Sequence, residues 1–89
     1  MRIKDGYVLR QVAQTWIVLP LGEAVINFSG MLTLNDSGVM LWNVLKQEGD
    51  MDALVQALVA EYDVTEEQAR EDAKEFVDKL IQIGCIERE

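Results

Sequence analysis

Residues 33–45, with the sequence TLNDSGVMLWNVL, mark the point at which the pattern of apolar residues changes. Before them, apolar and polar residues mostly alternate, as in strands; after them, apolar residues recur at intervals of three and four, as in helices. Asn35, Asp36 and Ser37 carry side-chain oxygens that accept hydrogen bonds from the free N–H groups of a helix start. The sequence therefore predicts a helix that begins here. Because it is apolar over most of its circumference, we expect it to lie at the centre of the fold.

The length and composition of the chain predict one globular domain over residues 1–89. A chain of 89 residues with 49% hydrophobic and 27% charged residues has the size and balance of a single folded unit. No run approaches the roughly 18 apolar residues of a membrane span, and the N-terminus has no apolar stretch typical of a signal sequence. We therefore expect a cytoplasmic protein with no membrane partner.

The charge and the missing residue types argue against several classes of function. Sixteen acidic and eight basic residues give a net charge of −8, so the protein repels phosphate and nucleic acid is not an expected partner. There is no histidine and only one cysteine, Cys85, so the usual zinc ligand sets cannot be assembled. The candidate nucleophiles Ser29, Ser37 and Cys85 have no evident base to activate them. We expect no catalysis, no cofactor and no bound metal.

The N-terminal third reads as three or four short antiparallel strands. Residues 7–12 and 15–19 are rich in β-branched and aromatic residues and are separated by two residues, which predicts a hairpin. Residues 24–28 are a further extended candidate, and the turn dipeptide Ser29-Gly30 leads into a last one at residues 31–34. The expected class is therefore α+β, with these strands followed by three helices in a winged helix-turn-helix-like order.

Two more helices follow the one that starts near Asp36. Apolar residues between Met51 and Tyr62 fall on a single helical face. Thr65 and Gln68 have the spacing of a reciprocal capping box, which starts the last helix at Glu66. Gly84 is well placed to supply the left-handed residue that ends that helix.

The apolar stripe of the last helix has a one-sided flank. Val77 and Ile81 lie to one side of the stripe, and Arg70 and Lys74 continue that side, whereas the opposite side has no apolar members. Two interpretations remain open. The flank covers an edge of the sheet or the first helix, or it forms one wall of an apolar groove with a basic rim.

Two other functional interpretations are less favoured. A winged helix-turn-helix that binds DNA through its last helix would press the acidic residues of that helix against phosphates. Asp36-Ser37-Gly38 resembles the site at which acyl carrier proteins receive phosphopantetheine, but those proteins are helical from near their N-terminus and this chain is not. Asp36 and Ser37 are more simply explained as groups that stabilise a helix start.

The order of these motifs resembles the PqqD family, the small peptide chaperones of pyrroloquinoline quinone biosynthesis and their relatives, also called RiPP recognition elements. The resemblance covers nearly the whole chain. After the hairpin, the motifs that carry it are Leu34-Asn35-Asp36-Ser37-Gly38, Leu41-Trp42-Asn43-Val44-Leu45, Tyr62-Asp63-Val64 and Leu80-Ile81-Gln82-Ile83-Gly84-Cys85-Ile86.

The resemblance implies a domain without activity of its own, which holds the leader segment of a ribosomally made precursor peptide as an added strand. It also implies that the peptide is presented to a modifying enzyme, often a radical SAM enzyme. By position, the implied peptide site comprises the third strand and one side of the last helix: Met31, Leu32, Thr33, Leu34, Arg70, Lys74, Val77, Asp78 and Ile81.

Three questions stay open at the level of sequence. Residues 22–28 are an addition relative to shorter family members, so the open sheet edge is formed by residues 24–28 or by residues 31–34. The same groove would also suit a regulatory or dimerisation domain. The expected oligomeric state is a monomer or a weak homodimer.

Overall fold

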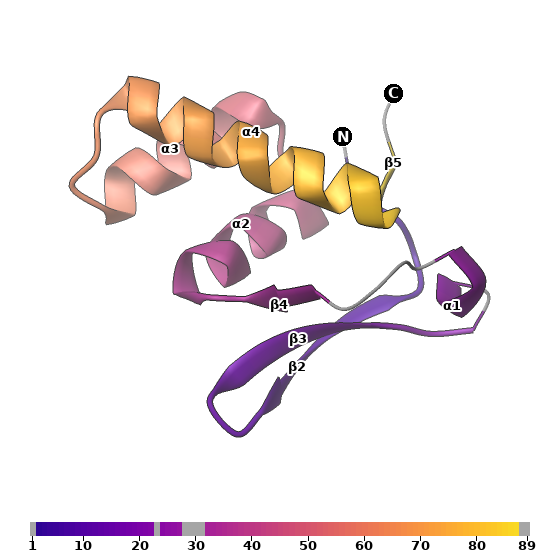
Figure 1. The fold of residues 1–89 in the computed structure, drawn as a ribbon. Coiled ribbons are helices and arrows are strands. Elements are labelled where there is room, and N and C mark those ends of the chain that lie inside the picture. Colours follow the sequence, from indigo (N-terminus) through magenta and orange to yellow (C-terminus); the bar gives the residue numbers. More distant parts are fainter. Residues whose placement is uncertain (1, 23, 28–31, 88–89) are drawn as a thin grey trace.

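The computed structural model describes residues 2–22, 24–27 and 32–87 of the chain (Figure 1). Short strands come first and longer helices follow, so the predicted α+β class is confirmed. The elements in chain order are β1 (Arg2–Ile3), β2 (Tyr7–Val12), β3 (Thr15–Pro20), α1 (Ala24–Asn27), β4 (Leu32–Leu34), α2 (Asp36–Lys46), α3 (Met51–Glu61), α4 (Glu66–Ile83) and β5 (Ile86–Glu87).

The strands form two separate antiparallel sheets. The larger sheet has the order β2-β3-β4, with Leu9 opposite Val18 and Val18 opposite Leu32. The smaller sheet pairs β1 with β5, so the two ends of the described chain lie side by side, as Figure 1 shows. The predicted hairpin is β2-β3. The β1-β5 pair was not predicted, because two-residue strands are too short to show a period.

The segment 24–28 is not a strand, contrary to one of the sequence predictions. Ala24 and Val25 donate backbone hydrogen bonds of 3.1 and 3.2 Å to the carbonyl oxygens of Leu21 and Gly22, three residues back. These local bonds form the short helix α1, and Gly22 before it has a positive φ of 57°. Phe28 lies outside the described residues. The third strand of the larger sheet is therefore β4.

The core lies between the larger sheet and the helices. Leu32 of β4, Leu45 of α2, Leu54 of α3 and Leu80 of α4 are all fully buried. Helix α2 buries Trp42 as well and contacts β1, β4 and α3, which confirms its predicted central position. Helices α3 and α4 pack against each other as a hairpin joined by a short link (Figure 1).

The helix starts are capped at the predicted places. The Asn35 side chain accepts a 2.9 Å hydrogen bond from the Gly38 N–H, and the Thr65 hydroxyl accepts one of 3.1 Å from the Gln68 N–H. The return bond of the predicted capping box is absent among the described contacts, since the Gln68 amide donates instead to Asp72 at 3.0 Å. Gly84 ends α4 in the left-handed conformation, as predicted.

Within the described ranges, no helix combines the length and the apolar character needed to cross a membrane.

Candidate functional site

A groove of about 690 Å³ lies between β4, the first turns of α2 and one side of α4. Its volume is within the range of roughly 300–1,000 Å³ that is usual for ligand sites. We call it the β4/α4 groove. The residues that line it are Thr33, Leu34, Asn35, Ser37, Gly38, Leu41, Leu58, Tyr62, Val64, Asp72, Glu75, Phe76 and Lys79.

The floor of the β4/α4 groove is apolar. Leu34, Leu41 and Leu58 are buried beneath it, and Phe76 is half-buried in its α4 wall. Tyr62, at the end of α3, is 37% exposed and adds an aromatic ring. The floor therefore offers a place where an apolar side chain of a ligand leaves water.

Gly38 keeps α2 close to β4 at one end of this floor. A Cβ atom at this position would lie 3.2 Å from the Leu34 Cβ and 3.3 Å from the Asn35 Oδ1 atom. Such contacts are tight, so a side chain at position 38 would push α2 away from the strand. The glycine at position 38 therefore permits the close approach of α2 and β4.

One edge of β4 borders the groove and is open. β4 pairs with β3 on one side, and none of the described strands pairs with it on the other. Thr33 and Leu34 belong both to this strand and to the groove lining. Because an open edge has free backbone N–H and C=O groups, an extended segment can add to it as a further strand. The sequence analysis gave two candidates for the open edge of the sheet, and in the structure this edge is β4.

The α4 wall of the groove is charged, and the opposite wall is not. Asp72, Glu75 and Lys79 project from α4, whereas Thr33, Asn35 and Ser37 line the other side. Two carboxylates and one ammonium group thus face the groove. The rim differs from the basic rim predicted from the sequence.

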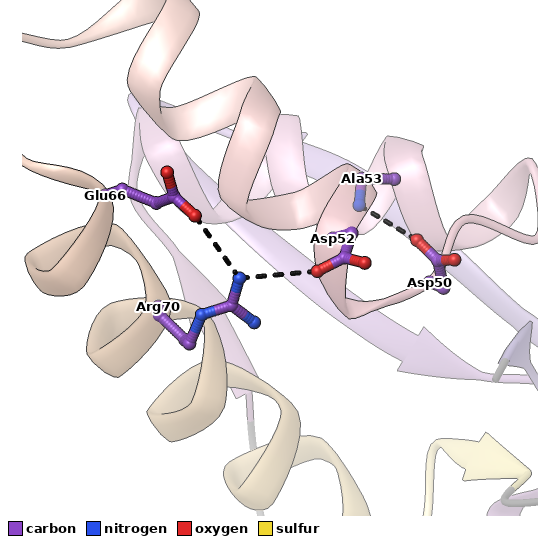
Figure 2. A network of polar contacts seen from close by, with 5 residues as sticks. All are labelled: Asp50, Asp52, Ala53, Glu66 and Arg70. Atoms are coloured by element: carbon purple, nitrogen blue, oxygen red, sulfur yellow. Dashed lines mark hydrogen bonds and ion pairs between the residues drawn. The ribbon is translucent and has the colours of Figure 1, made fainter.

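Arg70 was predicted to lie on the rim of the groove, but it faces α3. Figure 2 shows its guanidinium group between two carboxylates, 3.3 Å from the Asp52 Oδ1 atom of α3 and 3.6 Å from the Glu66 Oε1 atom of α4. All three side chains are at least half exposed, so the energy of these pairs is small. Their direction is informative, because it shows that this side of α4 is turned toward α3 and away from β4.

The other predicted residues on α4 do not line the groove either. Val77 is 2% exposed and belongs to the core, and Ile81 is half-buried against the core. Lys74 and Asp78 are absent from the groove lining and border a smaller depression of about 370 Å³, which Asp72 and Glu75 also line. The β4/α4 groove therefore lies on a different side of α4 from the predicted flank, because that apolar flank packs within the domain.

The predicted strand residues are placed as follows. Leu32 is fully buried, Thr33 is exposed and Leu34 is buried under the groove. Met31 lies outside the described residues. The sequence analysis missed Phe76 as a groove residue because it was assigned to the core stripe. Asp72 and Lys79 were missed because the groove was sought on the flank that carries Val77 and Ile81.

Cys85 is fully buried near the end of α4 and is not part of the groove. Burial raises the pKa of its thiol from 9.0 to about 11, and nearby Lys4 offsets only part of this effect. The thiol is therefore protonated at neutral pH and is a poor nucleophile. Within the part of the chain that the structure describes, no group of carboxylate and cysteine side chains could hold a metal ion.

Comparison with known proteins gives a family and a similar fold. Residues 15–86 match the family described as coenzyme PQQ synthesis protein D (PqqD). No curated protein matches the chain. A similar solved structure is TbiB1 in complex with the TbiA(beta) leader peptide, with a TM-score of 0.79 and 22% sequence identity. The similarity covers 100% of this chain and 98% of that one, and at this identity it shows the fold.

Proposed function

Because the chain belongs to the PqqD family, we propose that it is a non-catalytic recognition domain, formed by residues 1–89, that binds the leader segment of a ribosomally made precursor peptide. The leader adds to the open edge of β4 as an antiparallel or parallel strand and lies along the β4/α4 groove. The domain then presents the precursor to a modifying enzyme, which by the family resemblance is a radical SAM enzyme.

The observation that carries this proposal is the open edge of β4 beside an apolar-floored groove. In strand addition, the backbone ladder supplies affinity and pockets for alternate side chains supply specificity. This fold has both parts in one place, with Thr33 and Leu34 on the strand and Phe76 on the helix opposite. The similar fold of TbiB1, which was solved in complex with a leader peptide, supports a leader peptide as the ligand of this chain.

The chemistry of the side chains supports a binding role rather than an enzymatic one. The chain has no histidine, and its one thiol is buried with a raised pKa. The described residues of the groove therefore offer apolar surface, amide and hydroxyl groups and three exposed charges. These groups suit recognition of a peptide, because they can bind its backbone and side chains without a reactive centre.

The proposal revises which residues of the predicted set hold the peptide. Leu32, Thr33 and Leu34 remain, because they form the open strand. On α4, Phe76 replaces Val77 and Ile81 as the apolar contact. Arg70, Lys74 and Asp78 lie outside the groove and serve as matched positions for controls.

Calorimetric titration with a synthetic leader peptide tests the proposal. The probe is the leader of a precursor peptide, which a search for a short open reading frame beside this gene would first have to identify. We expect a dissociation constant in the micromolar range or tighter, which corresponds to about 8 kcal/mol or more. Phe76→Ala should weaken binding at least about tenfold, equivalent to about 1.4 kcal/mol, whereas Lys74→Ala on the outer side of α4 should leave it unchanged.

Three outcomes would contradict the proposal. The first is the absence of leader binding by the folded wild-type protein. The second is an equal effect of Phe76→Ala and Lys74→Ala, which would place the peptide elsewhere. The third is a stable dimer in gel filtration that persists when leader is added, since this would assign the β4 edge to a second copy of the chain.

A further inference from the structure

The charge inside the β4/α4 groove comes entirely from one helix. Asp72, Glu75 and Lys79 of α4 are the charged side chains among the groove residues, and the facing wall contributes neutral groups. A charged group on the peptide therefore meets α4. The sign of the peptide charge that the groove favours depends on which of these three side chains already have partners of opposite charge within the domain.

The Asp72 carboxylate has no cationic partner among the described residues. Its carboxylate accepts a 3.0 Å hydrogen bond from the Gln68 amide, which is neutral. Lys79 lies seven residues further along, about 10.5 Å along the helix axis, which is beyond ion-pair distance. Arg70 provides the contrast, because Asp52 and Glu66 already surround its guanidinium group.

Glu75 completes an acidic pair with Asp72. The two are three residues apart, so they are neighbours on one helix face, about 4.5 Å apart along the axis. Glu75 also lies four residues before Lys79, a spacing at which the two side chains can form an ion pair on the helix surface. The α4 wall thus has an unpaired carboxylate at Asp72 and a second carboxylate at Glu75, whose charge Lys79 can partly compensate.

The apolar part of the groove adjoins this pair. Phe76 lies four residues after Asp72, so the two are neighbours on one side of α4, and Glu75 lines the same groove. A lysine or arginine that reaches the carboxylates can lay its aliphatic stem, or its charged group, along that ring. One site therefore combines an apolar floor with a place for a cation.

Building on the proposed peptide-binding function, we propose that the β4/α4 groove selects a leader with an apolar side chain and a lysine or arginine two positions apart. In an extended strand, side chains two positions apart face the same side at a spacing of about 6.8 Å. The apolar side chain enters the floor beside Phe76, and the cation meets Asp72 and Glu75. The net charge of −8 adds long-range attraction for such a segment.

A basic rim formed by Arg70 and Lys74, one of the two interpretations of the sequence, would favour an acidic leader. The structure disfavours it for two reasons. Arg70 is turned toward Asp52 of α3, and Lys74 does not line the groove, although it borders a smaller depression together with Asp72 and Glu75. An acidic segment in the groove would face Asp72 without a compensating partner.

Two matched double variants test this inference. Asp72→Asn with Glu75→Gln removes both groove carboxylates, and Glu71→Gln with Asp78→Asn removes two carboxylates from the outer side of the same helix. All four side chains are exposed, so both variants should fold, which circular dichroism would check. Because each variant changes the net charge by +2, any effect of the overall field is the same in both.

We expect calorimetric titration of the leader at low salt to show at least a tenfold weaker affinity for the groove variant and less than a threefold change for the outer variant. The difference between them should shrink as salt is raised, because exposed charges are screened over about 10 Å at 0.1 M ionic strength. A leader in which the lysine or arginine is changed to glutamate should bind the wild-type protein at least tenfold more weakly. Asp72→Lys should recover part of that loss.

The results separate this inference from the proposed function. If Phe76→Ala weakens binding but the two double variants behave alike, the groove binds the peptide without charge selection and the inference is overturned. If the cognate leader has no basic residue near an apolar one and still binds, the inference is also overturned. If the wild-type protein binds no leader at all, the proposed function fails, and the inference fails with it.

Discussion

The Tyr7 hydroxyl donates a hydrogen bond of 3.2 Å to the carbonyl oxygen of Gly84, 77 positions later in the chain. The contact joins the start of β2 to the residue that ends α4. Close by, the Lys4 N–H donates to the Cys85 carbonyl oxygen at 2.8 Å. The C-terminal end of the helix that forms one wall of the groove is thus held by the N-terminal part of the chain.

Tyr7→Phe should lower the free energy of unfolding by about 0.5–1.5 kcal/mol, because it removes the hydroxyl and leaves the Gly84 carbonyl without this donor. Urea denaturation would measure the loss. Tyr62→Phe is the control, since Tyr62 is 37% exposed and lies in the groove. Equal stabilities for Tyr7→Phe and the wild-type protein would show that the contact contributes nothing.

Thr65→Ala should destabilise the protein by about 0.5–2 kcal/mol, because the Thr65 hydroxyl caps the first turn of α4. Thr65→Ser keeps the oxygen and should retain most of the stability. Thermal unfolding of the two variants would make the comparison. A melting temperature that is the same for alanine, serine and threonine would mean that the cap is not formed in solution.

Val77→Asp should prevent folding rather than act on peptide binding alone. Val77 is 2% exposed within the core, and a buried carboxylate costs several kcal/mol against a total stability of about 5–15 kcal/mol for a domain. Lys74→Asp introduces the same group at an exposed position of the same helix and should stay folded. Circular dichroism would distinguish them; a folded Val77→Asp protein that merely lost leader binding would return Val77 to the groove wall.

The stability of the protein should fall as the pH rises from about 9 to about 11. Burial raises the pKa of the Cys85 thiol from 9.0 to about 11, so the unfolded chain releases this proton at a lower pH than the folded one does. The stabilisation is therefore complete below pH 9 and is lost as the pH approaches 11.

Urea denaturation at several pH values would test this dependence, with Cys85→Ala as the control. Burial also raises the pKa of Tyr7, which acts with the same sign. Because the charge of Cys85 also raises the pKa of Tyr7, the difference between their pH profiles reports on Cys85 together with its effect on Tyr7. Parallel profiles would contradict the prediction.

The helices could be predicted from the sequence because each has both a period and a cap. Asn35, Thr65 and Gly84 mark helix ends in the structure as they do in the sequence. The segment 24–28 was misassigned because its apolar run resembles a strand, while the turn at Gly22 favours a helical start. β-branched residues alone do not distinguish the two when the segment is so short.

Only half of the candidate site could be predicted from the sequence. The open strand was one of two alternatives, because the pairing of β3 with β4 depends on contacts that no local pattern contains. The predicted side of α4 differs from the side that lines the groove, and the difference has a physical reason. Val77 and Ile81 are apolar because they pack against the core, whereas the groove wall needs only Phe76 and tolerates charged neighbours such as Asp72.

The pairing of β1 with β5 bears on when this domain can form during its synthesis. Ile3 lies opposite Ile86, so one of the first strands to leave the ribosome has to wait for one of the last. Contacts between residues so distant in sequence form late, since a long loop must close before they are made. The C-terminal end of α4 is therefore secured only after translation has reached β5. A nascent chain that has not yet reached β5 should therefore lack a secured α4 wall of the groove.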